Sequence, residues 1–185
     1  MSLKESNMLP LKTEARAFSL PDAVSGHTLS YSDIKGDKGT VVIFTCNHCP
    51  FVIHVNHQIV QIAESYMKKG IGFVAISSND IENYPDDSPD KMNIVAKVLK
   101  FPFPYLYDAS QSIAKAYDAA CTPDFYVFDA QSKLAYRGRL DGSRPGNDIP
   151  LTGADLRSAL DAVLLGAGDI SPQIPSAGCN IKWKD

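Results

Sequence analysis

The sequence predicts an α/β fold in which a central mixed β-sheet is flanked by helices. An unbroken apolar, β-branched run at residues 40–45 has the composition of a strand buried on both faces. A second apolar run follows at residues 71–76, and both runs border an amphipathic stretch that begins at Pro50 and ends at Gly70. Strand, helix and strand of these lengths form a βαβ unit with parallel strands. The apolar face of the helix is formed at three- and four-residue steps by Val52, Val55, Ile59, Ile62 and Tyr66.

Shorter elements are expected on both sides of this unit. Residues 17–20 and 27–30 indicate an N-terminal β-hairpin. A helix begins at Ser88-Pro89-Asp90, because serine caps a helix and proline suits its first position, and it extends to about Leu99. The remaining predictions are a short strand at 105–107, a short helix at 111–117, a β-hairpin formed by 125–128 and 134–139, and a last helix capped by Thr152, with Asp155 completing a capping box.

Composition narrows the classes of function. The 185 residues suit one domain, expected at 16–166, between a loose N-terminal segment (1–15) and a C-terminal tail (167–185) that docks on it. With 18 Lys and Arg against 21 Asp and Glu, the net charge of −3 gives no reason to expect nucleic acid or an anionic membrane as a partner. The N-terminus lacks the apolar core of a signal peptide. We therefore expect a cytoplasmic protein, whose thiols are kept reduced.

Two of the four cysteines form a Cys-X-X-Cys motif. Cys46-Asn-His-Cys49 stands where the first buried strand gives way to the helix. The unpaired N–H groups and the positive end of the helix dipole favour a thiolate there, and the thiolate is the reactive form of cysteine. We expect this position to lower the pKa of Cys46 from about 8.5 to roughly 3.5–7.5. The pattern predicts thiol–disulfide chemistry, and two structural core cysteines are the alternative.

A Cys-X-X-Cys motif at the first strand–helix junction, followed later by a β-hairpin and a helix, resembles the thioredoxin fold. Thr122-Pro123 strengthens the resemblance, because thioredoxin-like proteins carry such a pair, with a cis bond, facing the cysteine motif. The N-terminal hairpin and the insertion at 77–120 are similar to the peroxiredoxin branch (the alkyl hydroperoxide reductase, thiol-specific antioxidant and redoxin group). The resemblance covers about residues 16–185.

One departure from that branch concerns the peroxide-reactive cysteine. Peroxiredoxins usually carry Pro-X-X-X-Thr-X-X-Cys, whereas here no proline precedes the motif within 41–48, and Thr45 stands four positions before Cys49. The peroxidase signature is broken and the dithiol signature is intact. The resemblance implies that Cys46 attacks a substrate, that Cys49 resolves the mixed disulfide, and that no organic cofactor is needed.

Four further residues are candidates for supporting roles. His48 is expected either to stabilise the Cys46 thiolate or to be a solvated histidine. Thr122 and Pro123 are expected to present extended backbone to a substrate strand, with an ordinary turn as the alternative. Cys121 is interpreted as an alternative resolving thiol or as a small buried residue.

The tail cysteine and the arginines complete the candidate set. Cys179 is expected either to reach Cys46 or a neighbouring subunit, or to be buried. A peroxidase needs an arginine near its thiolate, and the candidates are Arg137, Arg139 and Arg144, with solvated or loop-bracing arginines as the alternative.

A metal site is not predicted. The two motif cysteines, His48 and His54 suggest zinc or copper, but a structural zinc site requires four converging ligands. His54 and His57 fall on the polar face of the predicted helix, where histidines are usually solvated.

Three functions follow in order of preference. The first is a thiol–disulfide oxidoreductase using Cys46 and Cys49. The second is a peroxiredoxin-like thiol peroxidase that reduces hydroperoxides through a sulfenic acid on one of these cysteines. The third is a redox-sensing or metal-carrying binding module. The expected partners are a protein or small-molecule disulfide, or a peroxide, and an external thiol reductant; the protein is expected to be a monomer or homodimer.

Overall fold

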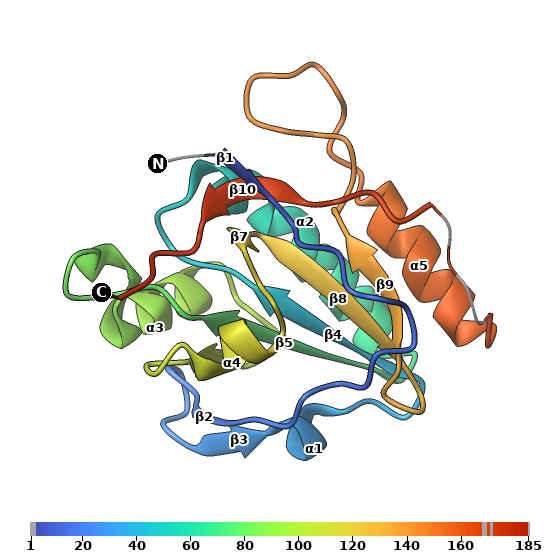
Figure 1. The fold of residues 1–185 in the computed structure, drawn as a ribbon, viewed down its shortest axis with the longest axis horizontal. Coiled ribbons are helices and arrows are strands. Elements are labelled where there is room, and N and C mark those ends of the chain that lie inside the picture. The colour runs from blue at the N-terminus through green and yellow to red at the C-terminus, as the bar shows by residue number, and fades with distance from the viewer. Residues whose placement is uncertain (1–2, 168–169, 171, 185) are drawn as a thin grey trace.

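The computed structural model describes residues 3–167, 170 and 172–184, and five strands form its central sheet (Figure 1). They are β4 (Gly39–Phe44), β5 (Ile71–Ser77), β6 (Tyr105–Tyr107), β8 (Asp124–Asp129) and β9 (Leu134–Gly138). Their order is β6-β5-β4-β8-β9, with β4, β5 and β6 parallel and with β8 antiparallel to both β4 and β9. The predicted mixed sheet and its βαβ unit are confirmed.

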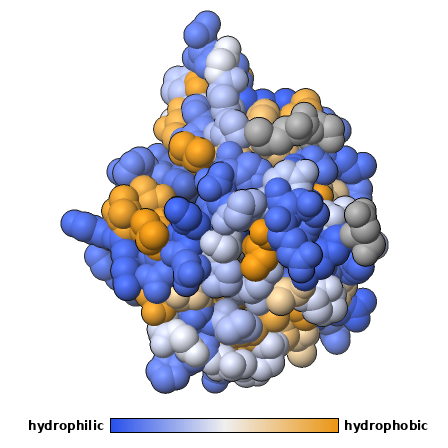
Figure 2. All heavy atoms as spheres, turned by 90° about the vertical axis from the view of Figure 1, so that its left-hand side faces the viewer, coloured by the Kyte–Doolittle hydropathy of each residue, from blue (hydrophilic) through white to orange (hydrophobic). Residues whose placement is uncertain are grey.

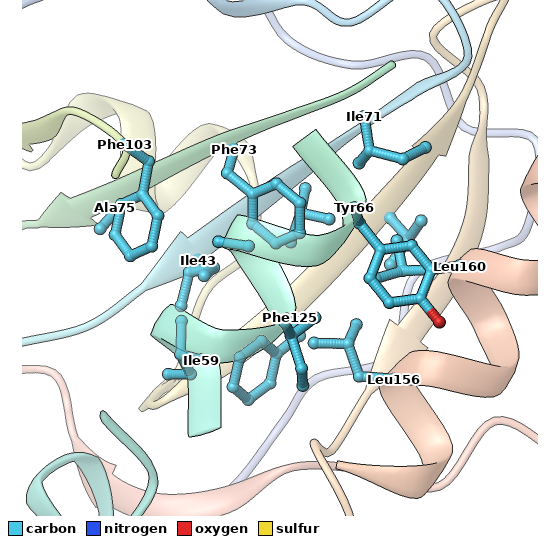
Figure 3. Packing of buried hydrophobic residues seen from close by; sticks show 14 of the residues in the cluster. Ile43, Ile59, Tyr66, Ile71, Phe73, Ala75, Phe103, Phe125, Leu156 and Leu160 are labelled. Atoms are coloured by element: carbon cyan, nitrogen blue, oxygen red, sulfur yellow. The ribbon is translucent and has the colours of Figure 1, made fainter. Parts of the chain in front are cut away.

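Successive side chains of β4 point to opposite faces of the sheet, and because all of them are apolar or buried, both faces need a covering layer. Val41 and Ile43 belong to one apolar cluster, and Val42 and Phe44 belong to another. The first cluster includes side chains of α2 (Pro50–Met67), α3 (Pro89–Val98) and α5 (Ala154–Leu164). Figure 3 shows side chains from α2 and α5 meeting those of the sheet on this face.

The opposite face is covered by shorter elements. These are the antiparallel hairpin of β2 (Ser19–Pro21) and β3 (Thr28–Ser30), with α1 (Tyr31–Ile34) and α4 (Ser112–Ala116). In the described part of the chain, no helix is long and apolar enough to cross a membrane. Figure 2 shows the side of the molecule that lies on the left in Figure 1, where apolar atoms form separate patches among polar ones.

A second sheet has three short strands and was not predicted. It contains β1 (Leu3–Glu5), β10 (Ala177–Asn180) and β7 (Cys121–Thr122), antiparallel in the order β1-β10-β7. The expectation that the first residues are loose is wrong for 3–6, because the edge of β10 provides backbone partners for β1. The Ser6 hydroxyl also donates to the carboxylate of Asp124, 3.0 Å away.

The start of α5 also differs from the prediction. The N-cap is Gly153, which adopts a φ of 70°, and no side chain caps the helix. The carboxylate of Asp141 instead accepts from the N–H groups of Thr152 and Gly153, at 2.7 and 2.6 Å. Asp155 is paired with Arg139 at 2.6 Å. The predicted capping box does not form, because the Thr152 hydroxyl accepts from the Ala154 N–H at 3.3 Å and the Asp155 carboxylate is held by Arg139. Likewise, α3 begins at Pro89 without a capping bond from Ser88.

A buried ion pair joins β8 to β9. Arg137 Nη2 lies 3.0 Å from Asp124 Oδ2, and both side chains are fully buried. The same nitrogen donates to the Asp118 carbonyl at 2.8 Å, and the guanidinium lies 4.4 Å from the centre of the Tyr126 ring. The Arg137 guanidinium therefore stabilises the pairing of β8 with β9.

Replacing Arg137 by alanine is expected to lower the free energy of unfolding by about 3–5 kcal/mol, because it leaves a buried carboxylate uncompensated. Urea denaturation measures the change. The matched control is Arg16→Ala on the exposed surface, expected to stay within about 0.5 kcal/mol of the wild type. An equally small effect of Arg137→Ala would contradict the assignment.

Candidate active site

The Cys-X-X-Cys motif lies where the sequence predicts it. Cys46 follows the end of β4, and Cys49 is the N-cap residue of α2. Pro50 occupies the first helical position, where its missing N–H group costs no hydrogen bond. The motif thus joins the central strand of the sheet to the amino end of its longest helix.

Thr122 on β7 contacts both sulfurs of the motif. Its hydroxyl lies 3.4 Å from Cys46 Sγ, and its carbonyl oxygen lies 3.5 Å from Cys49 Sγ. The Thr122–Pro123 peptide bond is cis, as the resemblance implies. The two segments that the sequence singled out, far apart along the chain, therefore form one site.

The structure contains a disulfide between Cys49 and Cys179, with Cα atoms 6.2 Å apart and a sequence separation of 130 residues. Cys179 reaches this position because it lies on β10, opposite Thr122 in the strand register. Cys46 and Cys121 are buried and free of disulfides. The sequence placed Cys179 against Cys46 or a second subunit; in the structure its partner is Cys49.

The thiol of Cys46 is protonated at neutral pH in this state. Its residue is 2% exposed, and burial, followed by the negative charge of Asp87, raises its pKa to about 11. Bonds from the Thr122 side chain and from the N–H groups of His48 and Cys49 act in the opposite direction. The expected lowering of the Cys46 pKa is therefore wrong for the disulfide-bonded form, because the loss of water outweighs the amides at the helix start.

Asp87 is a site residue that the sequence did not reveal. It belongs to a short 3-10 helix, Pro85–Asp87, and is fully buried. One carboxylate oxygen accepts from the Asn47 N–H at 2.7 Å, and the other accepts from the Asn79 amide at 2.7 Å. His48 Nδ1 lies 2.6 Å from the same carboxylate, and the His48 ring stacks on Tyr84. His48 is thus held against Asp87, with its side chain 18% exposed.

Three side chains of the site are of the metal-ligating kind. One ligand atom each from Cys46, His48 and Asp87 lies within 4.8 Å of the others. Two arguments weigh against a resident ion: a structural zinc site takes four ligands, and both oxygens of Asp87 already accept hydrogen bonds. His54, considered as a ligand from the sequence, instead contacts the Ser143 hydroxyl at 2.8 Å.

The other sequence candidates have different roles. The Cys121 thiol donates to the Ser176 carbonyl at 3.9 Å, and burial, followed by the charge of Asp124, raises its pKa. Arg137 is bound to Asp124, and Arg139 to Asp155. These three side chains therefore brace the fold around the site.

A cleft lies next to the site, and no cysteine is among the described residues that line it. Its walls include Phe51, Pro123, Arg139, Arg144 and Ala177. Phe51, at the start of α2, packs against the cluster formed by the three cysteines of the site. Arg139 and Arg144 thus line a cleft that is separated from the sulfurs by Phe51.

These features define a thioredoxin-like protein with three cysteines gathered at the amino end of α2. The chain belongs to the Redoxin family, whose model matches residues 10–156. An uncharacterized conserved protein from Geobacillus kaustophilus is 56% identical, with 100% of this chain and 97% of that chain covered and a TM-score of 0.97. A hypothetical protein from Sinorhizobium meliloti 1021 is 45% identical, with 97% and 98% covered and a TM-score of 0.94.

A more distant structure shows the same fold. It is a secreted disulfide oxidoreductase of Mycobacterium tuberculosis, 18% identical, with 78% of this chain and 95% of that chain covered and a TM-score of 0.59. A comparison with curated proteins gave no match. The predicted thioredoxin-like fold is confirmed, and family membership places the chain in a redox class of proteins.

Replacing Asp87 by asparagine is expected to lower the pKa of Cys46, because it removes the second cause of the upward shift while burial persists. The pKa should remain above the ordinary value of 9.0. Iodoacetamide labelling of the disulfide-bonded protein across pH, with the label located on Cys46 by mass spectrometry, gives the titration. Asp86→Asn, at the exposed neighbouring position, is the control and should leave the curve unchanged. Identical curves for the wild type and Asp87→Asn would contradict the electrostatic role.

Proposed function

We propose that this protein is a thiol–disulfide oxidoreductase whose reactive dithiol is Cys46 and Cys49. The observation that carries the proposal is the gathering of Cys46 and Cys49 at the amino end of α2, where the Thr122 hydroxyl contacts the Cys46 sulfur and the Thr122 carbonyl contacts the Cys49 sulfur. A sulfur at this position is within bonding distance of another cysteine. Membership of the Redoxin family supports the same class of chemistry.

The reaction begins with the reduced protein. The Cys46 thiolate attacks one sulfur of a disulfide, forms a mixed disulfide and releases the first thiolate of the substrate. Cys49 then attacks the Cys46 sulfur, so that a Cys46–Cys49 disulfide forms and the second substrate thiolate leaves. An external thiol reduces this bond by two further exchanges. Electrons thus pass from the external thiol to the substrate, and each released thiolate takes up a proton from solvent.

His48 and Asp87 adjust the charge around Cys46. The Asp87 carboxylate opposes ionisation of the Cys46 thiol, and His48 lies 2.6 Å from that carboxylate. A hydrogen bond from His48 to the carboxylate would draw its negative charge away from Cys46, so that burial remains as the main obstacle to the thiolate. His48 therefore acts on Cys46 through Asp87, as a positioning and charge-balancing residue.

Cys46→Ser and Cys49→Ser are each expected to reduce turnover of a disulfide substrate by about three orders of magnitude or more, since each removes a sulfur that is bonded during the cycle. Turnover is followed with dithiothreitol as the external thiol, after the uncatalysed rate is subtracted. Cys121→Ser is the control, because that buried thiol lies outside the proposed cycle. Full turnover by either motif variant would overturn the assignment.

A second candidate activity is that of a thiol peroxidase, and the pairing of Cys49 with Cys179 favours it. A Cys49 thiolate would take one oxygen atom from a hydroperoxide, become a sulfenic acid and release an alcohol or water. The Cys179 thiol would then condense with the sulfenic acid, releasing water and forming the Cys49–Cys179 disulfide.

The two activities differ in their dependence on peroxide. A peroxidase consumes hydrogen peroxide in a saturable way, and its Cys179→Ser variant accumulates a sulfenic acid on Cys49 that dimedone traps. The oxidoreductase shows neither property, yet it reduces a disulfide substrate. Parallel measurements on the wild type and on Cys179→Ser therefore separate the two activities.

A further inference from the structure

The strand edge beside the cysteines is occupied by the chain itself. β7 pairs with β10, so that Cys179 lies opposite Thr122 and Asn180 lies opposite Cys121. The other edge of β10 is paired with β1, where Leu3 lies opposite Cys179. Figure 1 shows β10 between β1 and β7. An extended polypeptide that binds by strand addition needs a free edge, and this edge is covered by two strands.

The position of β10 beside β7 rests on contacts other than the disulfide. Gly178 packs so closely on β7 that a Cβ atom there would overlap the Thr122 carbonyl oxygen. Beyond β10, Ile181 is 1% exposed and donates its N–H to the Ala120 carbonyl at 3.2 Å. The Lys182 N–H donates to Asn79 at 2.9 Å, and the Lys182 carbonyl accepts from Gln111 and from the Asp80 N–H, each at 2.8 Å. These contacts hold the strand in addition to the disulfide.

The three cysteines of the site are buried next to β10 or within it. Cys46, Cys49 and Cys179 are 2%, 0% and 4% exposed. A disulfide carried by a protein brings bulky backbone with it and has to align with the attacking sulfur. A low-molecular-weight disulfide needs only a local opening, and Phe51, which packs against the cysteine cluster, is also a wall of the neighbouring cleft.

We propose that β10 makes the site selective for size, so that the substrate is a low-molecular-weight disulfide rather than a cysteine-containing polypeptide. The inference rests on the proposed function and names its substrate class. The reaction is the one described above. Cys46 attacks the small disulfide, its two thiolates are released, and the Cys46–Cys49 disulfide closes.

The test compares two oxidants of the fully reduced protein. Anaerobic reduced protein is mixed with hydroxyethyl disulfide or with insulin, and the loss of protein thiols is measured over time. Each rate is divided by the rate of the same oxidant with glutathione, which removes differences in intrinsic reactivity. The normalised rate with hydroxyethyl disulfide should exceed that with insulin by about 100-fold, because access limits exchange.

Gly178→Ala tests the role of the strand without altering a sulfur. The added Cβ should separate β10 from β7, so that the normalised insulin rate rises about tenfold relative to the normalised rate with hydroxyethyl disulfide. Gly142→Ala is the matched control, since a Cβ there would lie 3.5 Å from Ile149, an ordinary contact. It should behave as the wild type. Circular dichroism checks that both variants are folded.

A second measurement needs no variant. Reduced wild-type protein is treated with N-ethylmaleimide or with a maleimide linked to polyethylene glycol, and the rates are normalised to glutathione. Labelling of Cys46 and Cys49 should be strongly disfavoured for the polymer-linked reagent alone. Equal normalised rates with insulin and with hydroxyethyl disulfide, or with both maleimides, would overturn the size selection and leave the oxidoreductase intact. Failure of both disulfides to oxidise the protein would overturn the oxidoreductase itself.

Discussion

The contact of Thr122 with two sulfurs is the interaction on which the site depends. Thr122 belongs to β7, a strand of only two residues, which has little stability of its own. Its position is fixed because β10 pairs with it and because β8, which follows directly, is a buried strand of the central sheet. The geometry around Cys46 and Cys49 therefore results from the junction of two sheets.

Burial governs the chemistry of this junction. A helix start favours a thiolate, but Cys46 is almost without water and lies near the buried carboxylate of Asp87. In the disulfide-bonded form, the protonated Cys46 thiol is therefore buried beside the Cys49–Cys179 disulfide. Next to the Asp87 carboxylate, 2.6 Å away, lies the Nδ1 atom of His48, so that Cys46, Asp87 and His48 form one polar cluster inside the site.

Elements that are set by local sequence patterns could be predicted, whereas elements that are set by long-range contacts could not. The strands of the βαβ unit are encoded by unbroken apolar runs and its helix by an apolar period of 3.6 residues, and their predicted positions agree with the structure to within a few residues. Segments with weak local signals were missed. β1 and β10 are short strands that exist because they pair with each other and with β7, and the predicted cap of α5 was displaced by the carboxylate of Asp141.

The sequence by itself determined the thioredoxin-like fold, the place of Cys46 and Cys49 at a strand–helix junction, and the Thr122–Pro123 pair, because each is set by a short stretch of chain. Only the tertiary structure decided that Cys49 is bonded to Cys179, that Asp87 faces Cys46 and His48, and that the strand edge is covered. These features join residues far apart along the chain, and their burial and distances arise only when the sheets pack together.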